Sequence, residues 1–294
     1  MKIIGQLGLL VTCAVFAPAY AQFGNFNLNK LLDKGKSIVD AQKPINESDE
    51  INIGEGAAAV MLGAIPLHRD TDLQKYVNRV GRWVATQTTR PDLPWTFGVL
   101  DTPTINAFAM PGGKIFVSAG LLAKLRSESE LAGVLGHEIA HVMQRHTVKV
   151  IEATRSAGAW AAIGQDVLSD RIAQSKAAGN PLVGALATTA GAEGIDLVKK
   201  GLFLRPLDRA LEYEADRIGA LLSAKAGYDP YGYIAVLQTL AALKPEDGGS
   251  LSLSTHPSAN ERLAELEKYA TTLDRYAGQF TGDERFAKVI AAIK

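Results

Sequence analysis

The chain has 294 residues, and its 31 Lys and Arg residues balance its 31 Asp and Glu residues. Hydrophobic residues make up 47% of the chain, which is enough to build a core and excludes a mainly disordered protein. The zero net charge argues against a protein that binds nucleic acid through a basic surface, so we expect no nucleic-acid partner. A single Cys excludes a disulfide scaffold.

The first 21 residues have the pattern of a cleavable secretory signal peptide. Met1-Lys2 gives a positive start, residues 3–16 are mostly apolar, and Ala19-Tyr20-Ala21 is a small-residue cleavage site. The apolar run is shorter than the roughly 18 residues of a membrane-spanning helix, so we expect no transmembrane anchor. A lipoprotein signal ending at Cys13 is the alternative, but the Thr before this Cys and the apolar residues after it fit that signal poorly.

Removal of the signal would leave a mature chain that begins at Gln22 and contains no Cys. A chain without free thiols suits an oxidising compartment, and the short signal favours a bacterial periplasm. We therefore expect a periplasmic protein.

The remaining chain divides into a polar leader at residues 22–46, a main domain at residues 47–268 and a charged helical tail at residues 269–294. Within the main domain, residues 157–204 are rich in Ala and Gly and separate two motif-bearing helices. Because small side chains pack weakly, we expect this stretch to act as a mobile lid. No repeat of about 20–50 residues is visible, so no helical-repeat extension is expected.

In chain order, the pattern first turns helical at about residues 48–62. Residues 70–87 repeat apolar side chains at spacings of three and four, which predicts a helix with one buried stripe. Short β-like runs follow at 95–100, 105–110 and 114–118, with a Pro-Gly-Gly turn between the last two. Later segments have helical patterns, so we predict a mainly α protein with a small antiparallel β-sheet, an α+β fold. The predicted stripe comprises Leu73, Tyr76, Val77, Val80, Trp83 and Val84.

The motif His137-Glu138-Ile139-Ala140-His141 lies in a predicted helix that begins with a capping box formed by Ser127 and Glu130. Residues four apart on a helix share a face, so both imidazoles can bind one metal ion. Zinc suits two neutral imidazoles and an oxygen ligand in a tetrahedral site, and we expect one Zn²⁺ per chain. Glu138 is rotated away from the metal yet can reach a water bound to it, whose proton the carboxylate would take.

The sequence after this motif does not supply a third His ligand. In the extended form H-E-x-x-H-x-x-G-x-x-H, the Gly and final His positions correspond here to Gln144 and Thr147. His146 follows His137 by nine residues, about half a turn around a continuous helix, so we expect it to point away from the metal, either at the surface or behind a ligand residue.

A carboxylate is the remaining candidate for the third ligand. The helix predicted from Arg209 to about Ala226 places Glu212 and Asp216 four residues apart on one face. One of the two could bind zinc while the other orients a ligand imidazole. Glu214 competes for the ligand role, and a solvated face with Arg209 in a local ion pair is the alternative interpretation.

Together, several stretches resemble the gluzincin peptidase family, which includes the heat-shock membrane protease HtpX, the CAAX prenyl endopeptidase, and the Oma-type and BepA-type proteases. The resemblance covers about residues 47–268 and looks closest to the soluble, exported BepA-type members. It implies a zincin-like metallopeptidase domain. The stretches are Asn106–Val117, Gly120-Leu121-Leu122, His137–His141, Arg209…Glu212…Asp216 and His256-Pro257…Arg262.

The resemblance implies that His137, His141 and Glu212 are the zinc ligands and that Glu138 is the general base. It also implies that Asp216, together with Arg209, orients a ligand imidazole from behind.

His256 and Arg262 would return to the cleft as catalytic residues. In some BepA-type members the equivalent His is linked to a fourth, inhibitory zinc contact, and in others to holding the tetrahedral intermediate. The resemblance leaves both roles open for His256. A turn residue before Pro257 is the alternative interpretation.

The family resemblance gives the strand predicted at residues 114–118 a role in substrate binding, because an extended peptide can pair with an exposed strand edge. The strand runs toward the metal helix, so we expect it to hold the substrate; a purely structural hairpin is the alternative. The expected substrate-pairing residues are Lys114, Ile115, Phe116 and Val117.

The predicted function is a zinc-dependent endopeptidase that hydrolyses peptide bonds in unfolded or misassembled cell-envelope proteins, through a zinc-bound water activated by Glu138. One alternative is a periplasmic chaperone-like binding protein with a latent, self-inhibited zinc site, and another is a hydrolase of non-peptide amide bonds. The expected partners are unfolded or misfolded envelope proteins, with peripheral contact to outer-membrane assembly proteins. The lack of helical repeats argues against recruitment through such repeats.

Overall fold

The computed structural model describes residues 44–156, 207–243, 256–291 and 293. The first two helices of this part of the chain each begin after a capping residue. Asn46 caps α2 (Glu47–Ala64) and Asp70 caps α3 (Thr71–Ala85), each by accepting a backbone hydrogen bond with its side chain. All described residues fall within the unit Asp40–Lys294. The predicted signal peptide, nearly all of the leader and the predicted lid lie outside the described residues.

The predicted apolar stripe of α3 is buried except at one position. Trp83 is 54% exposed, although its indole N–H donates to the Ala226 carbonyl oxygen at 2.8 Å. This residue therefore covers the end of another helix instead of entering the core. The buried members are Leu73, Tyr76, Val77, Val80 and Val84.

The sheet has three strands in the order β1-β3-β2, formed by β1 (Thr96–Leu100), β2 (Ala107–Met110) and β3 (Lys114–Ser118). β2 and β3 are antiparallel, as predicted, but β1 and β3 are parallel. The mainly α fold with a small sheet is confirmed, and the wholly antiparallel arrangement is wrong. After β1 the chain skips the neighbouring position in the sheet and forms β2, which runs in the opposite direction. It then turns back as β3, which fills the position between β1 and β2.

The central position of β3 contradicts its predicted role as the substrate-pairing strand. Ile115, for example, lies opposite Phe97 of β1 on one side and Ala109 of β2 on the other. All five residues of β3 are buried. Because both edges of this strand are already paired, Lys114, Ile115, Phe116 and Val117 offer no free backbone edge to a peptide.

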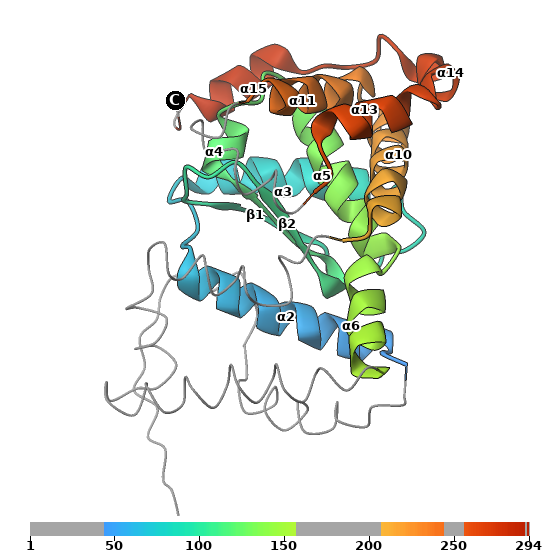
Figure 1. The fold of residues 1–294 in the computed structure, drawn as a ribbon. Helices are drawn as coiled ribbons and strands as arrows, with labels where there is room; N and C mark the ends of the chain where they lie inside the picture. The colour runs from blue at the N-terminus through green and yellow to red at the C-terminus, as the bar shows by residue number, and fades with distance from the viewer. Residues whose placement is uncertain (1–43, 157–206, 244–255, 292, 294) are drawn as a thin grey trace, which may run out of the picture. The chain divides into compact units, whose positions relative to one another are not determined.

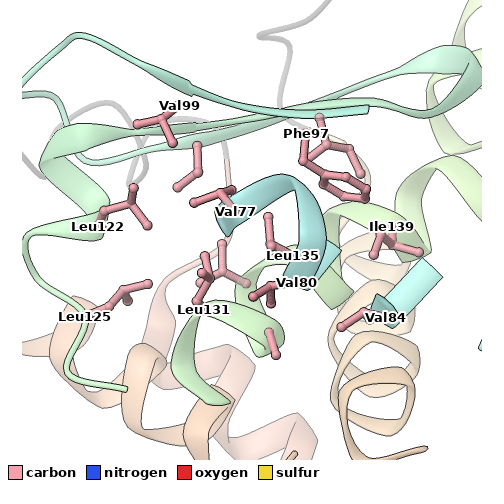
Figure 2. Packing of buried hydrophobic residues seen from close by; sticks show 14 of the residues in the cluster. Val77, Val80, Val84, Phe97, Val99, Leu122, Leu125, Leu131, Leu135 and Ile139 are labelled. Carbon is pink, nitrogen blue, oxygen red and sulfur yellow. The ribbon is translucent and has the colours of Figure 1, made fainter. Parts of the chain in front are cut away.

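The helix with the H-E-x-x-H motif, α5 (Glu128–Met143), runs through the middle of the described structure (Figure 1). It contacts α3, β2 and two later helices, α10 (Arg209–Lys225) and α11 (Tyr231–Ala242). Figure 2 shows apolar side chains of α3, β1 and α5 packed together, including Val77, Phe97 and Leu135. The other helical elements are α4 (Ala119–Leu122), α6 (His146–Ser156), α13 (Ala259–Glu267), α14 (Ala270–Leu273) and α15 (Asp283–Ile290), and the 3-10 turns η1 (Pro111–Gly113) and η3 (Asp274–Tyr276).

The start of α5 follows only part of the predicted capping box. The Ser127 hydroxyl accepts from the Glu130 backbone N–H, as expected for a helix cap. The Glu130 carboxylate does not return to Ser127; it accepts from the backbone and guanidinium of Arg126. The helix is nevertheless buried along almost its whole length, which makes it a rigid support for the motif.

Glycines allow α5 and α10 to approach each other closely at the motif. A Cβ atom added at Gly136 would lie 2.5 Å from the carbonyl oxygen of Gly219, and one added at Gly219 would lie 2.5 Å from the backbone N of His137. Such distances are shorter than real contacts, so only glycines fit this crossing. The close crossing brings the acidic face of α10 up to His137.

Candidate metal centre

The two motif histidines point toward each other from one face of α5. The Nε2 atoms of His137 and His141 are 3.0 Å apart, and their rings meet edge to face with centroids 4.6 Å apart. Both side chains are buried. The i, i+4 spacing thus produces the convergence that the sequence predicts.

Glu212 of α10 completes a triangle with these imidazoles. Its Oε2 lies 3.6 Å from His137 Nε2, and its Oε1 lies 3.6 Å from His141 Nε2. The side chain is fully buried, and Oε1 has no hydrogen-bond partner within the described part of the chain. Burial by itself would raise the pKa of Glu212, but His256 and the two motif imidazoles lower it well below its usual range.

This donor set fits a tetrahedral metal ion. Bonds of about 2.0–2.2 Å to zinc place neighbouring ligand atoms roughly 3.3 Å apart. Here the two imidazole Nε2 atoms are 3.0 Å apart, and each lies 3.6 Å from one of the two oxygens of Glu212. A buried carboxylate oxygen without a partner is rare in proteins, and a cation between the three side chains would satisfy it.

A buried network behind His137 fixes its orientation. Asp216 Oδ1 lies 2.8 Å from His137 Nδ1, so His137 carries a proton on Nδ1 and turns its Nε2 lone pair toward Glu212. Arg262 donates to Asp216 Oδ2 from Nε at 2.9 Å, and the Tyr233 hydroxyl donates to Oδ1 at 2.7 Å. Burial opposes ionisation of Asp216, but Arg262 outweighs it and holds the pKa of this carboxyl well below its usual range.

Arg262 and Arg209 do not occupy the positions that their predicted roles require. Arg262 lines the cavity, but its guanidinium bonds to Asp216 and Tyr233 and approaches His137, so it acts here as a positioning residue. Arg209 does not reach the site: its side chain is exposed and pairs with Glu261 at 2.7 Å. Its predicted role behind the ligands is wrong, because Arg262 already neutralises Asp216, while Arg209 at the exposed start of α10 remains in solvent.

His256 enters the site as the resemblance implies. Its Nδ1 lies 2.5 Å from Glu212 Oε2, and ligand atoms of His137, Glu212 and His256 all lie within 4.8 Å of one another. Burial would lower the pKa of His256, but the Glu212 carboxylate raises it above its usual value. His256 therefore occupies an oxygen that a metal ion would also use, and its inhibitory and assisting roles both stay predictions.

A cavity adjoins the cluster and contains the expected base. Glu138 and His256 line it together with an apolar wall that includes Val134, Val236 and Leu240. Glu138 is 5% exposed, and burial raises the pKa of its carboxyl. A carboxylate with a raised pKa next to the candidate metal ligands can both accept and return a proton.

Two further buried residues belong to this region, and the sequence did not indicate the first of them. Tyr233 of α11 hydrogen-bonds to Asp216 and stacks on His137 with ring centroids 5.9 Å apart. His146, expected to point away, lies with its Nδ1 2.9 Å from His141 Nδ1. The assumed continuous helix and a surface position are wrong, because α5 ends at Met143 and Arg145 has a left-handed φ of 58°, whereas a position behind a ligand residue agrees with the structure. No motif marks Tyr233, and no Gly or Pro marks the break before His146.

Comparisons with known proteins show similarity to metallopeptidases. Residues 71–270 match the sequence profile of Peptidase family M48. The chain is 34% identical over 206 residues to the mitochondrial metalloendopeptidase OMA1 of Schizosaccharomyces pombe, covering 70% of this chain and 55% of that protein. It is 29% identical over 296 residues to the beta-barrel assembly-enhancing protease of Escherichia coli K12, covering 98% of this chain and 56% of that protein.

The fold and the site define a metallopeptidase, and the chain belongs to Peptidase family M48. The predicted gluzincin resemblance and the predicted metalloendopeptidase class are confirmed at the level of the family. The chain spans about half the length of the curated relatives it matches, 55% and 56% for the two proteins above. Among the described residues, no helix has the length and apolar character needed to span a bilayer.

Proposed function

We propose that this protein is a zinc-dependent endopeptidase that cleaves unfolded or misassembled proteins of the cell envelope. The observation that carries the proposal is the convergence of His137, His141 and Glu212 beside a cavity that Glu138 lines. The names of the relatives, a metalloendopeptidase and a beta-barrel assembly-enhancing protease, support this substrate class. The predicted export signal supports a periplasmic location.

In this proposal His137, His141 and Glu212 hold the zinc ion. When bound, zinc would polarise the substrate carbonyl and acidify the attacking water. Glu138 takes the proton from the water and later delivers it to the leaving amine. Burial raises the pKa of Glu138, which favours its taking up the proton before it is delivered to the amine.

The edge of β2 is the best candidate for binding an extended substrate. The Asn106 carbonyl accepts from Ser118 N at 3.0 Å, and hydrogen-bonded pairs alternate along an antiparallel ladder. The backbone N–H and C=O groups of Ala107 and Ala109 therefore point away from β3, toward an edge that no described strand covers. Ala107 also lines the cavity beside Glu138.

The opposite edge of the sheet is closed to a peptide. The Gln74 side chain both donates to the Val99 carbonyl and accepts from the Val99 N–H, each at 2.8 Å. Asn78 accepts from the Phe97 N–H at 3.0 Å. Side chains of α3 thus make the hydrogen bonds that a further strand beside β1 would make. The edge of β2 therefore remains for β-augmentation by a substrate peptide.

Cleavage of a permanently unfolded protein, with and without a chelator, tests the proposed activity. Wild type should cleave and lose activity with the chelator, while Glu138→Gln should bind one zinc and cleave at least 100-fold more slowly, the scale of general acid–base catalysis. A zinc-loaded wild type that cleaves neither unfolded proteins nor peptides would contradict the proposal.

A chaperone-like protein with a latent site is the second candidate, favoured by the contact between His256 and Glu212. It predicts that wild type and Glu138→Gln both retain unfolded clients without cleaving them. Cleavage of small amides but not of proteins would instead indicate an amide hydrolase.

A proline substitution tests the proposed substrate edge. Ala109→Pro removes the outward N–H while leaving the pairs at Phe108 and Met110, so we expect a higher KM and about tenfold lower kcat/KM, consistent with one lost hydrogen bond. Ala109→Gly keeps the N–H and serves as the control. Equal kinetics in the two variants would place the substrate elsewhere.

A further inference from the structure

Two side chains behind His141 have no part in the reaction described above. His146 is fully buried, and its Nδ1 lies 2.9 Å from His141 Nδ1 while its Nε2 lies 3.3 Å from Glu214 Oε2. The two imidazole rings meet edge to face, with centroids 5.0 Å apart. The side chains of His141, His146 and Glu214 thus form a line from the candidate metal ligands to the Glu214 carboxylate, whose side chain is 35% exposed.

The chain makes an unusual turn to place His146 in this line. Arg145 has a φ of 58°, which non-glycine residues seldom adopt and which persists only where surrounding contacts determine it. Glu50 of α2 supplies such a contact by accepting from Arg145 Nε at 3.0 Å, and the Ile45 carbonyl accepts from the same guanidinium. Because of this turn, the first residue of α6 lies directly behind His141.

The donors and acceptors along the line can be satisfied in only one direction. An ionised Glu214 carboxylate can only accept, so His146 carries its proton on Nε2 and presents a lone pair on Nδ1. His141 must then carry its proton on Nδ1, which leaves the lone pair of its Nε2 directed toward His137 and Glu212. The reverse arrangement would place a lone pair of His146 against the carboxylate and an N–H where a metal ion would bind.

We infer that His146 and Glu214 are positioning residues that hold His141 in its metal-binding tautomer and orientation. Asp216 does the same for His137 directly, whereas the contact to His141 passes through a second imidazole. This inference rests on the proposed metal site but does not require peptidase activity. Partners of this kind typically contribute 10- to 100-fold to metal affinity.

Substitutions at His146 test the hydrogen bond separately from the packing. His146→Phe keeps a buried ring without a hydrogen bond, and His146→Asn retains an acceptor near the position of Nδ1. We expect zinc affinity, measured by chelator competition, to fall about 10- to 100-fold in His146→Phe and to recover largely in His146→Asn. The absorption spectrum of the cobalt-substituted protein should change in His146→Phe, because the orientation of a ligand changes.

A substitution at the exposed end of the line covers the case in which His146→Phe does not fold. Glu214→Ala should weaken zinc binding by up to about tenfold while the unfolding temperature of the metal-free protein stays unchanged. Glu265→Gln, which removes a charge paired with Lys268 at the surface, is the matched control and should bind zinc like wild type.

Unchanged zinc affinity in both His146→Phe and Glu214→Ala would overturn the inference. Equal losses in His146→Phe and His146→Asn would also overturn it, because they would assign the effect to packing. A wild-type protein that binds no zinc would overturn the proposed function as well, so the two failures are distinguishable.

Discussion

At the scale of single residues, Glu212 determines whether the cluster can hold a metal ion. Its two oxygens approach the two motif imidazoles, and one of these oxygens has no other partner in the described structure. We expect Glu212→Ala to lose zinc, measured as metal content after gel filtration. A free-zinc concentration of 100 times Kd should stabilise wild type by about 2.7 kcal/mol and leave Glu212→Ala unaffected. Equal zinc-induced stabilisation in both proteins would exclude Glu212 as a ligand.

Tyr233 has a structural role that is separable from metal binding. Its hydroxyl donates to Asp216 and accepts from Arg262, within a fully buried network. Tyr233→Phe should lower the free energy of unfolding by about 1–2 kcal/mol, the value of one buried hydrogen bond, and retain zinc because Arg262 still pairs with Asp216.

Urea unfolding and zinc titration of Tyr233→Phe and its control measure the two effects. Tyr231→Phe removes an exposed hydroxyl that bonds Asp274 and is the matched control, with an expected change below about 0.5 kcal/mol. Similar destabilisation by both substitutions would mean that the buried network adds no stability.

At the scale of elements, the crossing of α5 and α10 sets the distance between the motif and Glu212. Gly219→Ala would place a Cβ atom 2.5 Å from the backbone N of His137, and backbone atoms cannot move aside as a flexible side chain can. We expect a loss of about 1–3 kcal/mol in stability, together with weaker zinc binding because α10 must shift.

The close crossing should reverse the change in stability that a Gly to Ala substitution usually causes in a helix. A Gly to Ala substitution inside a helix ordinarily stabilises by about 0.5–1 kcal/mol, because it restricts the unfolded chain. Calorimetry and chelator competition on Gly219→Ala would therefore disprove the role of the close crossing if stability rose and zinc affinity stayed constant.

At the scale of the whole described structure, a buried carboxylate connects the start of α5 to distant parts of the chain. Glu128 accepts from the hydroxyls of Tyr76 in α3 and Tyr228 after α10, and it pairs with Arg285 of α15. Burial, together with the Glu128 carboxylate, raises the pKa of both tyrosines well above the usual value near 10. The C-terminal helix α15 is thereby attached to the helix that holds the motif.

These raised pKa values predict a loss of stability at alkaline pH. Below pH 10 both the folded and the unfolded chain keep the two phenolic protons, so the contribution is fully present. Above pH 10 the unfolded chain releases them while the folded chain holds them, so the free energy of unfolding falls as pH rises. Urea unfolding between about pH 8 and 11 should show a shallower decline in a Tyr76→Phe, Tyr228→Phe double variant than in wild type. Parallel curves would contradict this assignment.

The sequence by itself determined the features that depend on local spacing. Helical periodicity identified α3 and α5, and the i, i+4 spacing correctly predicted that His137 faces His141 and that Glu212 and Asp216 share a face of α10. The short β-like runs and the Pro-Gly-Gly turn identified the three strands and the β2–β3 hairpin. Hydrogen bonds and side-chain directions within one element depend on nearby residues, so the sequence pattern carries them.

The tertiary structure alone decided which of these elements meet. The position of β3 between β1 and β2 depends on pairing between separate segments, and it leaves β2, with Ala107 and Ala109, as the edge where we propose that the substrate pairs. The left-handed turn that brings His146 behind His141 depends on Glu50, which is 95 residues from Arg145 in the chain. Contacts between residues so far apart leave no periodic signal in the sequence, because each partner satisfies its local pattern equally well without the other.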